Sequence, residues 1–136
     1  MDTTVVTTPP VVMGLYDKPM WESIHARGMK LQCCRICGSW QYPPGPGCIA
    51  CGSEEQEWTS LSGQATILSW EIFQRQYLPA YPAPYNVIAV RLAEGPVMIS
   101  NLEGAKPEGN WIGSAVRLIY VDMPDGAVLP RFTLAE

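Results

Sequence analysis

The sequence of 136 residues predicts a small, mainly β protein with one short N-terminal helix. Thirteen prolines and 12 glycines disfavour long helices and favour short strands joined by turns. From Gly63 onward, apolar and polar residues alternate with the period of two that strands show. With 47% hydrophobic residues the chain is too apolar to be disordered. Only 16% of residues are charged, against about a quarter in typical domains, so part of the surface is expected to face a partner.

The charge balance and the apolar runs exclude several classes of protein. A net charge of −4 argues against a protein held mainly by nucleic-acid phosphates. No apolar run approaches the roughly 18 residues that a membrane span needs. The first lysine is Lys18, so no basic region precedes an apolar stretch as in a signal peptide. We therefore expect a cytoplasmic protein whose five cysteines are reduced and serve as metal ligands rather than as disulfides.

Residues 1–16 are expected to form a flexible N-terminal arm. The stretch from Met1 to Gly14 is β-branched and broken by prolines, and Asp2 is its single charged residue. Its paired valines are costly to leave exposed, which favours a second interpretation in which the arm becomes extended on a partner's surface.

A helix is predicted from Asp17 to Arg27, within a helical segment that covers residues 17–29. Asp17 can cap its start, Pro19 suits its first turn, and Gly28 can end it in a left-handed conformation. No acidic or nucleophilic motif surrounds the sole histidine, so a structural or solvent-facing role is favoured over that of a catalytic base. The predicted apolar stripe consists of Trp21, Ile24 and His25.

Two Cys-x-x-Cys-Gly motifs predict a metal site within residues 30–60. Cys34 and Cys37 precede Gly38, ten residues separate Cys37 from Cys48, and Cys48 and Cys51 precede a second glycine. Four thiolates satisfy a tetrahedral zinc ion and leave no open position for water, so we predict one structural zinc per chain in a rubredoxin-like ribbon. A redox-active Cys pair and rubredoxin-like iron are the alternatives.

Cys33 is the fifth cysteine and stands directly before the first motif. It is interpreted as a bystander thiol, with a competing ligand or a reactive site as the alternative.

Five strands are predicted within residues 61–136, enough for a small Greek-key barrel of the OB type. A six-stranded or SH3-like barrel would give much the same pattern. Short turns such as Glu94-Gly95-Pro96 and Pro124-Asp125-Gly126 would connect the strands. The predicted strands are residues 66–73, 87–92, 97–102, 115–121 and 128–134.

The whole pattern resembles the DUF35 family, zinc-ribbon and OB-fold proteins associated with acyl-CoA metabolism. The resemblance covers nearly everything from Lys18 to the C-terminus. Departures are the bridge Pro44-Gly45-Pro46-Gly47, where the family often carries an arginine, and Ile49, where it often has proline. The matching segments include Pro19-Met20-Trp21-Glu22, Leu31-Gln32, Tyr42-Pro43-Pro44, Cys51-Gly52-Ser53, Leu61-Ser62-Gly63, Pro84-Tyr85, Asn101-Leu102, Ile112-Gly113 and Leu129-Pro130-Arg131-Phe132.

The resemblance implies a non-catalytic accessory subunit. Family members assemble with thiolase-superfamily enzymes or aldolases that act on acyl-CoA, as in sterol side-chain degradation, or with a MaoC-like hydratase. Their ribbon and barrel would help to form the path of the CoA pantetheine arm, so this chain would contact acyl-CoA only through the complex and have no catalytic residue of its own. Binding of single-stranded nucleic acid and a free-standing enzyme or electron carrier are the alternatives.

Aromatic residues and arginines are the candidate contact residues. A proline-rich stretch from Tyr77 to Tyr85 is long, rigid and aromatic, which suits a recognition surface. Core packing and solvated strand positions are the competing interpretations. The predicted partner interface consists of Trp70, Tyr77, Tyr81 and Tyr85, with Trp111 as a further anchor. The predicted CoA contacts are Arg75 first, then Arg91 and Arg131.

Overall fold

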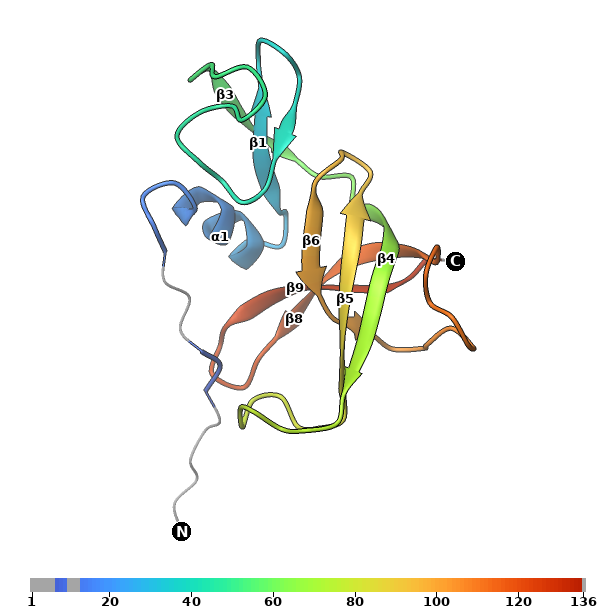
Figure 1. Cartoon of the computed structure of the whole chain (residues 1–136). Coiled ribbons are helices and arrows are strands. Elements are labelled where there is room, and N and C mark those ends of the chain that lie inside the picture. Colours follow the sequence, from blue (N-terminus) through green and yellow to red (C-terminus); the bar gives the residue numbers. More distant parts are fainter. Residues whose placement is uncertain (1–6, 10–12, 136) are drawn as a thin grey trace.

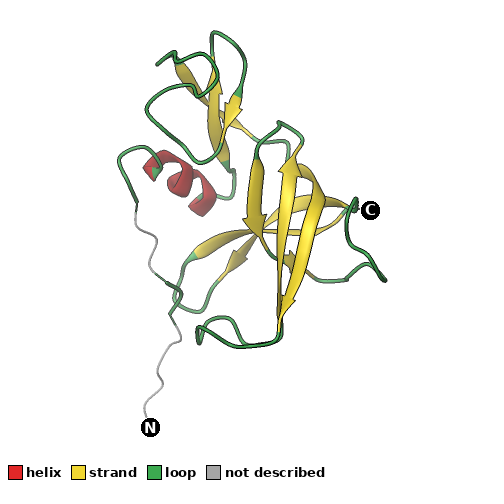
Figure 2. Cartoon of the chain, viewed as in Figure 1, coloured by secondary structure: helices red, strands yellow, loops and turns green. Residues whose placement is uncertain are grey.

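The computed structural model describes residues 7–9 and 13–135 and contains two sheets and one helix (Figure 1). A small three-stranded sheet has the order β2-β1-β3, and a larger six-stranded sheet has the order β6-β5-β4-β8-β9-β7. Strand, helix and loop segments are distinguished by colour in Figure 2. The elements are α1 (Lys18–His25), β1 (Lys30–Cys34), β2 (Trp40–Gln41), β3 (Gln56–Ser60), β4 (Gln64–Phe73), β5 (Tyr85–Leu92), β6 (Val97–Ser100), β7 (Leu102–Glu103), β8 (Ala115–Asp122) and β9 (Val128–Leu134).

The predicted mainly β fold is confirmed, and α1 is shorter than expected and ends differently. Arg27, with a φ of 62°, takes the left-handed position that we expected Gly28 to take. The Gly28 N–H donates to Ser23 O and the Arg27 N–H to Ile24 O, both at 2.9 Å, which is the Schellman pattern of helix ends. Asp122 forms an ion pair with the Arg27 side chain.

The buried face of α1 also differs from the predicted stripe. Met20 and Ile24 are buried, Trp21 is half-buried, and His25 is exposed, so the contact face runs through Met20 rather than His25. Asp17 stands at the N-cap without a side-chain hydrogen bond to the helix.

A single hydrophobic core joins the helix, the base of the small sheet and the large sheet. Ile24 of α1 and Leu31 of β1 belong to the same buried cluster as Ile67, Val90 and Phe132 of the barrel. Figure 1 shows α1 beside the lower end of β1 and next to the large sheet. The metal-binding segment is therefore anchored through its base to the barrel core.

The predicted strand 97–102 breaks at Asn101, so the barrel segment has six strands instead of five. β6 pairs with β5, whereas β7 runs parallel to β9 with Leu102 opposite Phe132. The Asn86 side chain bonds to both the N–H and the C=O of Leu102, at 2.6 and 2.8 Å, and this fixes the change of direction. Sequence alternation alone carries no mark of this switch.

Part of the predicted arm is attached to the barrel. Thr8 is 8% exposed, and its N–H and hydroxyl both donate to Asp125 Oδ2 at 2.8 Å in the turn between β8 and β9. Residues 1–6 and 10–12 lie outside the described residues, and the arm prediction for them stays a prediction. Within the described ranges, no helix has the length and apolar character required to cross a bilayer.

The Thr8 contact is expected to weaken at acid pH. Hydrogen bonds from the Ala127 N–H, then from Thr8, lower the pKa of Asp125. A depressed folded-state pKa stabilises the contact above the unfolded-state value, and this contribution is lost as pH falls through the folded-state pKa. The Thr8 amide resonance should therefore move toward its position in Asp125→Ala as a titration passes below pH about 4. A Thr8 amide chemical shift that changes neither on acidification nor in the Asp125→Ala variant would contradict the contact.

Candidate metal centre and docking surface

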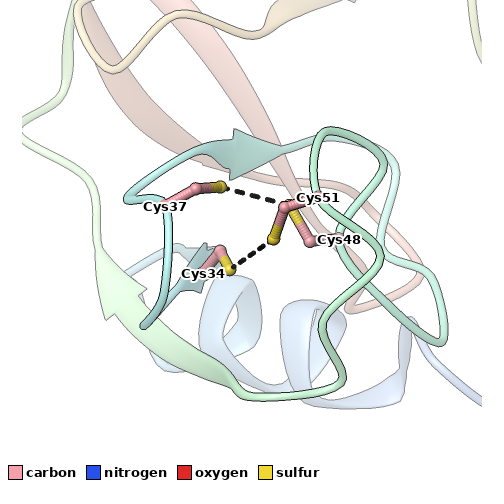
Figure 3. Close-up of side chains that lie close together, drawn as sticks. All are labelled: Cys34, Cys37, Cys48 and Cys51. Carbon is pink, nitrogen blue, oxygen red and sulfur yellow. Dashed lines mark hydrogen bonds between the residues drawn. The ribbon is translucent and has the colours of Figure 1, made fainter.

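Four cysteine side chains meet at the end of the small sheet (Figure 3). Their Sγ atoms all lie within 4.8 Å of one another, with Cys34 to Cys51 at 3.6 Å and Cys37 to Cys48 at 3.5 Å. A tetrahedral zinc ion with Zn–S distances of about 2.3 Å requires sulfur separations of about 3.8 Å. The four thiols therefore fit one zinc ion and would complete its coordination.

The two motifs form nearly identical knuckles. The Ile36 N–H points at Cys34 Sγ and the Ala50 N–H at Cys48 Sγ, each at 3.4 Å. Gly38 and the equivalent Gly52 both have a φ of 77°, a left-handed conformation that favours glycine. Amide groups directed at sulfur stabilise thiolates, which are the form that binds metal. The repeated geometry supports a structural zinc site, and the four cysteines fit one structural zinc per chain.

Cys37 and Cys33 differ in their environments. Cys37 Sγ lies 3.2 Å from Ser39 Oγ, and the Ser39 hydrogen bonds lower the pKa of Cys37 to about 6. Burial raises the pKa of Cys33, whose Sγ lies 3.6 Å from the Gly38 carbonyl and outside the four-sulfur cluster. Cys33 thus lies beside the metal site without belonging to the four-sulfur cluster.

Two buried glutamines support the knuckles, and the sequence analysis missed them. Gln32 of β1 exchanges two hydrogen bonds of 2.9 Å with the backbone of Gly45, and Gln41 of β2 accepts the Ile49 N–H at 3.1 Å. A Cβ at Gly45 would lie 2.9 Å from the Gln41 amide, so glycine permits this close approach. The sequence signal for these supporting side chains would have been a glutamine at an inward-facing strand position.

An aromatic surface lies at the other end of the barrel, over the loop between β4 and β5. Phe73 contacts Tyr85 with ring centroids 5.2 Å apart and Tyr77 at 6.4 Å, and Tyr81 lies 6.3 Å from Tyr85. Ile99 of β6, 65% exposed, extends the surface and helps to line a groove of about 310 Å³ beside these rings. We call Phe73, Tyr77, Leu78, Tyr81, Tyr85 and Ile99 the aromatic surface.

Trp70 and Trp111 lie apart from the aromatic surface. Their rings stack at 4.4 Å with an interplanar angle of 12°, and Trp111 is only 5% exposed. The structure therefore makes Trp111 a core residue rather than a partner anchor. Trp70 is half-buried and packs against the same core.

The three candidate arginines are dispersed. Arg75 is exposed, with its guanidinium 5.4 Å from the centre of the Tyr77 ring. Arg91 is exposed on β5 and donates to the Gly95 carbonyl at 3.0 Å in the β5–β6 turn. The Arg131 side chain is 12% exposed and lines a pocket of about 430 Å³ under the aromatic loop. No common phosphate site unites them.

Two family models match adjacent parts of the chain. The rubredoxin-like zinc ribbon domain of ChsH2 matches residues 30–57, and the C-terminal OB-fold domain of ChsH2 matches residues 58–124. The first model covers the knuckles and the small sheet, and the second covers most of the barrel.

Three curated relatives share about a third of their aligned residues with this chain. A probable enoyl-CoA hydratase alpha subunit from Thermomonospora curvata is 32% identical over 85% of the chain. The 3-oxo-4,17-pregnadiene-20-carboxyl-CoA hydratase alpha subunit of Mycobacterium tuberculosis is 31% identical over 77%. A DUF35 domain-containing scaffold protein from Pyrococcus furiosus is 32% identical over 60% of the chain. The aligned regions span 37%, 33% and 61% of these relatives.

Solved structures extend the similarity to the whole fold. A chain of the Ltp2-ChsH2(DUF35) aldolase superposes with a TM-score of 0.85 and 28% identity, covering 93% of this chain and 100% of that one. A DUF35 protein of unknown function from Sulfolobus solfataricus has a TM-score of 0.61 at 13% identity, over 90% of this chain and 87% of its own, and so shares the fold. With its zinc ribbon, its OB-fold and these relatives, the chain belongs to the DUF35 family.

Proposed function

We propose that this protein is a non-catalytic accessory subunit of an enzyme complex that acts on acyl-CoA. The observation that carries the proposal is the full-length similarity to a chain of the Ltp2-ChsH2(DUF35) aldolase. The relative from Pyrococcus furiosus is named as a scaffold protein, and two other relatives are named as hydratase alpha subunits. These names support the same role. A four-cysteine zinc site is coordinatively complete, so it stabilises the fold and offers no open position for chemistry.

The proposed partner is a thiolase-superfamily enzyme, either a thiolase or a retro-aldol lyase that cleaves a carbon–carbon bond of a CoA thioester. A steroid side-chain thioester is the proposed substrate, because one relative is named for a pregnadiene-carboxyl-CoA, and a MaoC-like hydratase is the second candidate partner. The lyase or transferase chemistry would belong to the partner, with this chain helping to form the path of the pantetheine arm. The proposed location is the cytoplasm, where cysteine ligands stay reduced.

We further propose that the aromatic surface is the docking site for this partner. Tyr77 is 63% exposed and Ile99 65% exposed, which leaves large apolar side chains uncovered in the isolated chain. Aromatic residues with an apolar body and a polar tip are enriched at protein interfaces. Arg75, exposed beside this surface, is the proposed contact for a CoA phosphate, ahead of the more distant Arg91. Trp70, on the core side, is a weaker anchor.

Docking is tested by co-purification from the native host with a tag on Glu136. We expect a thiolase-like, aldolase or hydratase protein together with about one zinc per chain. Tyr77→Ala and Tyr85→Ala should each weaken partner binding by about 2 kcal/mol, roughly thirtyfold, with zinc content unchanged.

Tyr16→Ala is the matched control, since Tyr16 is also an exposed tyrosine (43%) but precedes α1 and lies outside the aromatic surface. It should leave the affinity unchanged. Equal affinities for all three variants would place the interface elsewhere. Capture of nucleic acid, or of no protein at all, would refute the proposed function.

A further inference from the structure

The loop that carries the aromatic surface is attached to the barrel in an unusual way. In the residues that the structure describes, no hydrogen bond joins residues 74–84 to the barrel, and one internal bond, from the Tyr81 N–H to Leu78 O, measures 3.1 Å. Three prolines in this stretch have no N–H to donate. The position of the loop therefore depends on side-chain packing.

Arg131 of β9 supplies the charged contact between this loop and the barrel. Its guanidinium carbon lies 5.7 Å from the centre of the Tyr81 ring. A cation over an aromatic face is attracted by the ring quadrupole, and more strongly when it is desolvated. With 12% of its side chain exposed, Arg131 is largely desolvated.

Two polar side chains of the barrel contact the Arg131 guanidinium. Arg131 Nη1 donates to Asn101 Oδ1, and Arg131 Nε lies 3.8 Å from Glu103 Oε1. The Asn101 amide in turn donates to the Asn86 carbonyl, next to the bonds by which Asn86 fixes Leu102. The Arg131 guanidinium is thus bonded to the same hydrogen-bond network that ends β6 and starts β7.

We infer that Arg131 is a positioning residue that holds Tyr81, and with it the aromatic loop, in the conformation that docks the partner. The inference rests on the proposed docking function for its biological meaning. A loop fixed before binding loses less conformational entropy on association, so Arg131 would raise affinity by holding the loop. Because Nη1 already donates to Asn101 and the guanidinium charge is balanced by Glu103 at 3.8 Å, this role fits Arg131 better than that of a CoA phosphate clamp.

Trypsin cleavage after Arg75 tests the inference on the isolated, zinc-loaded chain. Arg75 is exposed at the start of the loop, and cleavage requires the loop to leave its packed conformation. Arg131→Met keeps most of the side-chain volume but removes the cation, and should accelerate cleavage at this bond about tenfold. Zinc content should stay as in the unaltered protein, and so should cleavage after the remaining lysines and arginines.

Four further variants make the test specific. Tyr81→Leu should loosen the loop as Arg131→Met does, Tyr81→Phe should not, and the double variant Arg131→Met/Tyr81→Leu should be no faster than either single one. Arg91→Met, which removes an exposed arginine bonded to the β5–β6 turn, should leave the rate unchanged. Should Arg131→Met fail to fold, Tyr81→Leu against Tyr81→Phe decides the result.

An unchanged cleavage rate in Arg131→Met or Tyr81→Leu, or an equal increase at every tryptic site, would overturn the positioning role. A slower association rate of Arg131→Met with the captured partner, at unchanged melting temperature, would support it. Because the cleavage test needs no partner, an absent partner would refute the proposed function while the cleavage result still decides the role of Arg131.

Discussion

Cys34→Ser is expected to abolish zinc binding and unfold the ribbon, whereas Cys33→Ser leaves both intact. The two cysteines are neighbours, but only Cys34 Sγ belongs to the four-sulfur cluster, at 3.6 Å from Cys51 Sγ. A structural zinc site contributes about 10–16 kcal/mol of apparent binding free energy, and binding is coupled to folding. The free energy that depends on the intact ligand set is therefore comparable with the whole stability of a typical domain.

The measurement is zinc content by elemental analysis, combined with circular dichroism of both variants. Cys34→Ser should contain less than about a tenth of the zinc of the unaltered protein and should aggregate or lose the β1–β3 strands. Cys33→Ser should match the unaltered protein in both respects. A folded, metal-free Cys34→Ser protein would remove the structural role, and loss of zinc in Cys33→Ser would make Cys33 a ligand. A red, absorbing centre would indicate iron instead of zinc.

The metal site could be predicted from the sequence because all its information is local. Each knuckle is five residues long, with an amide directed at sulfur and a glycine in the left-handed conformation at its end. The spacing of the cysteines fixes the donor set. Only the glutamine hydrogen bonds to the backbone of Gly45 and Ile49 could not be predicted without the fold. Strand periodicity likewise gave β4, β8 and β9 to within a few residues.

Other features depend on contacts between residues distant in sequence. Arg131 and Tyr81 are 50 residues apart along the chain and meet only because β9 and the β4–β5 loop lie at the same end of the barrel. The strand break at Asn101 is set by the side chain of Asn86 on another strand. Trp111 is buried because Trp70 stacks on it, a pairing that alternation does not encode.

The helix end shows a different limit. Glycine is the favoured residue for a left-handed helix end, and Gly28 stood in a suitable place. The Schellman hydrogen bonds instead put Arg27 in that conformation, where its ion pair with Asp122 of β8 connects the helix end to the barrel. The left-handed position therefore lies one residue before the glycine that the local preference favours.

Phe132→Ala is expected to lower the free energy of unfolding by about 3–5 kcal/mol, a large part of the 5–15 kcal/mol of a typical domain. Phe132 is fully buried in β9, paired with Leu118 on β8 and with Leu102 on β7. It closes the barrel between two strands, so the cavity left by alanine cannot be filled by either neighbour. Phe132→Leu, which keeps most of the volume, should cost about 1 kcal/mol.

Urea unfolding followed by tryptophan fluorescence measures this loss, and a zinc-chelating dye in the same titration measures metal release. Because Met29 and Leu31 at the base of the ribbon share one core cluster with Phe132, both signals should move together to lower urea in Phe132→Ala. Zinc release that stays at its original midpoint while fluorescence shifts would mean that the ribbon unfolds independently. Coincident transitions would show that the barrel and the zinc ribbon stabilise each other through that core. The barrel also carries the loop of the aromatic surface.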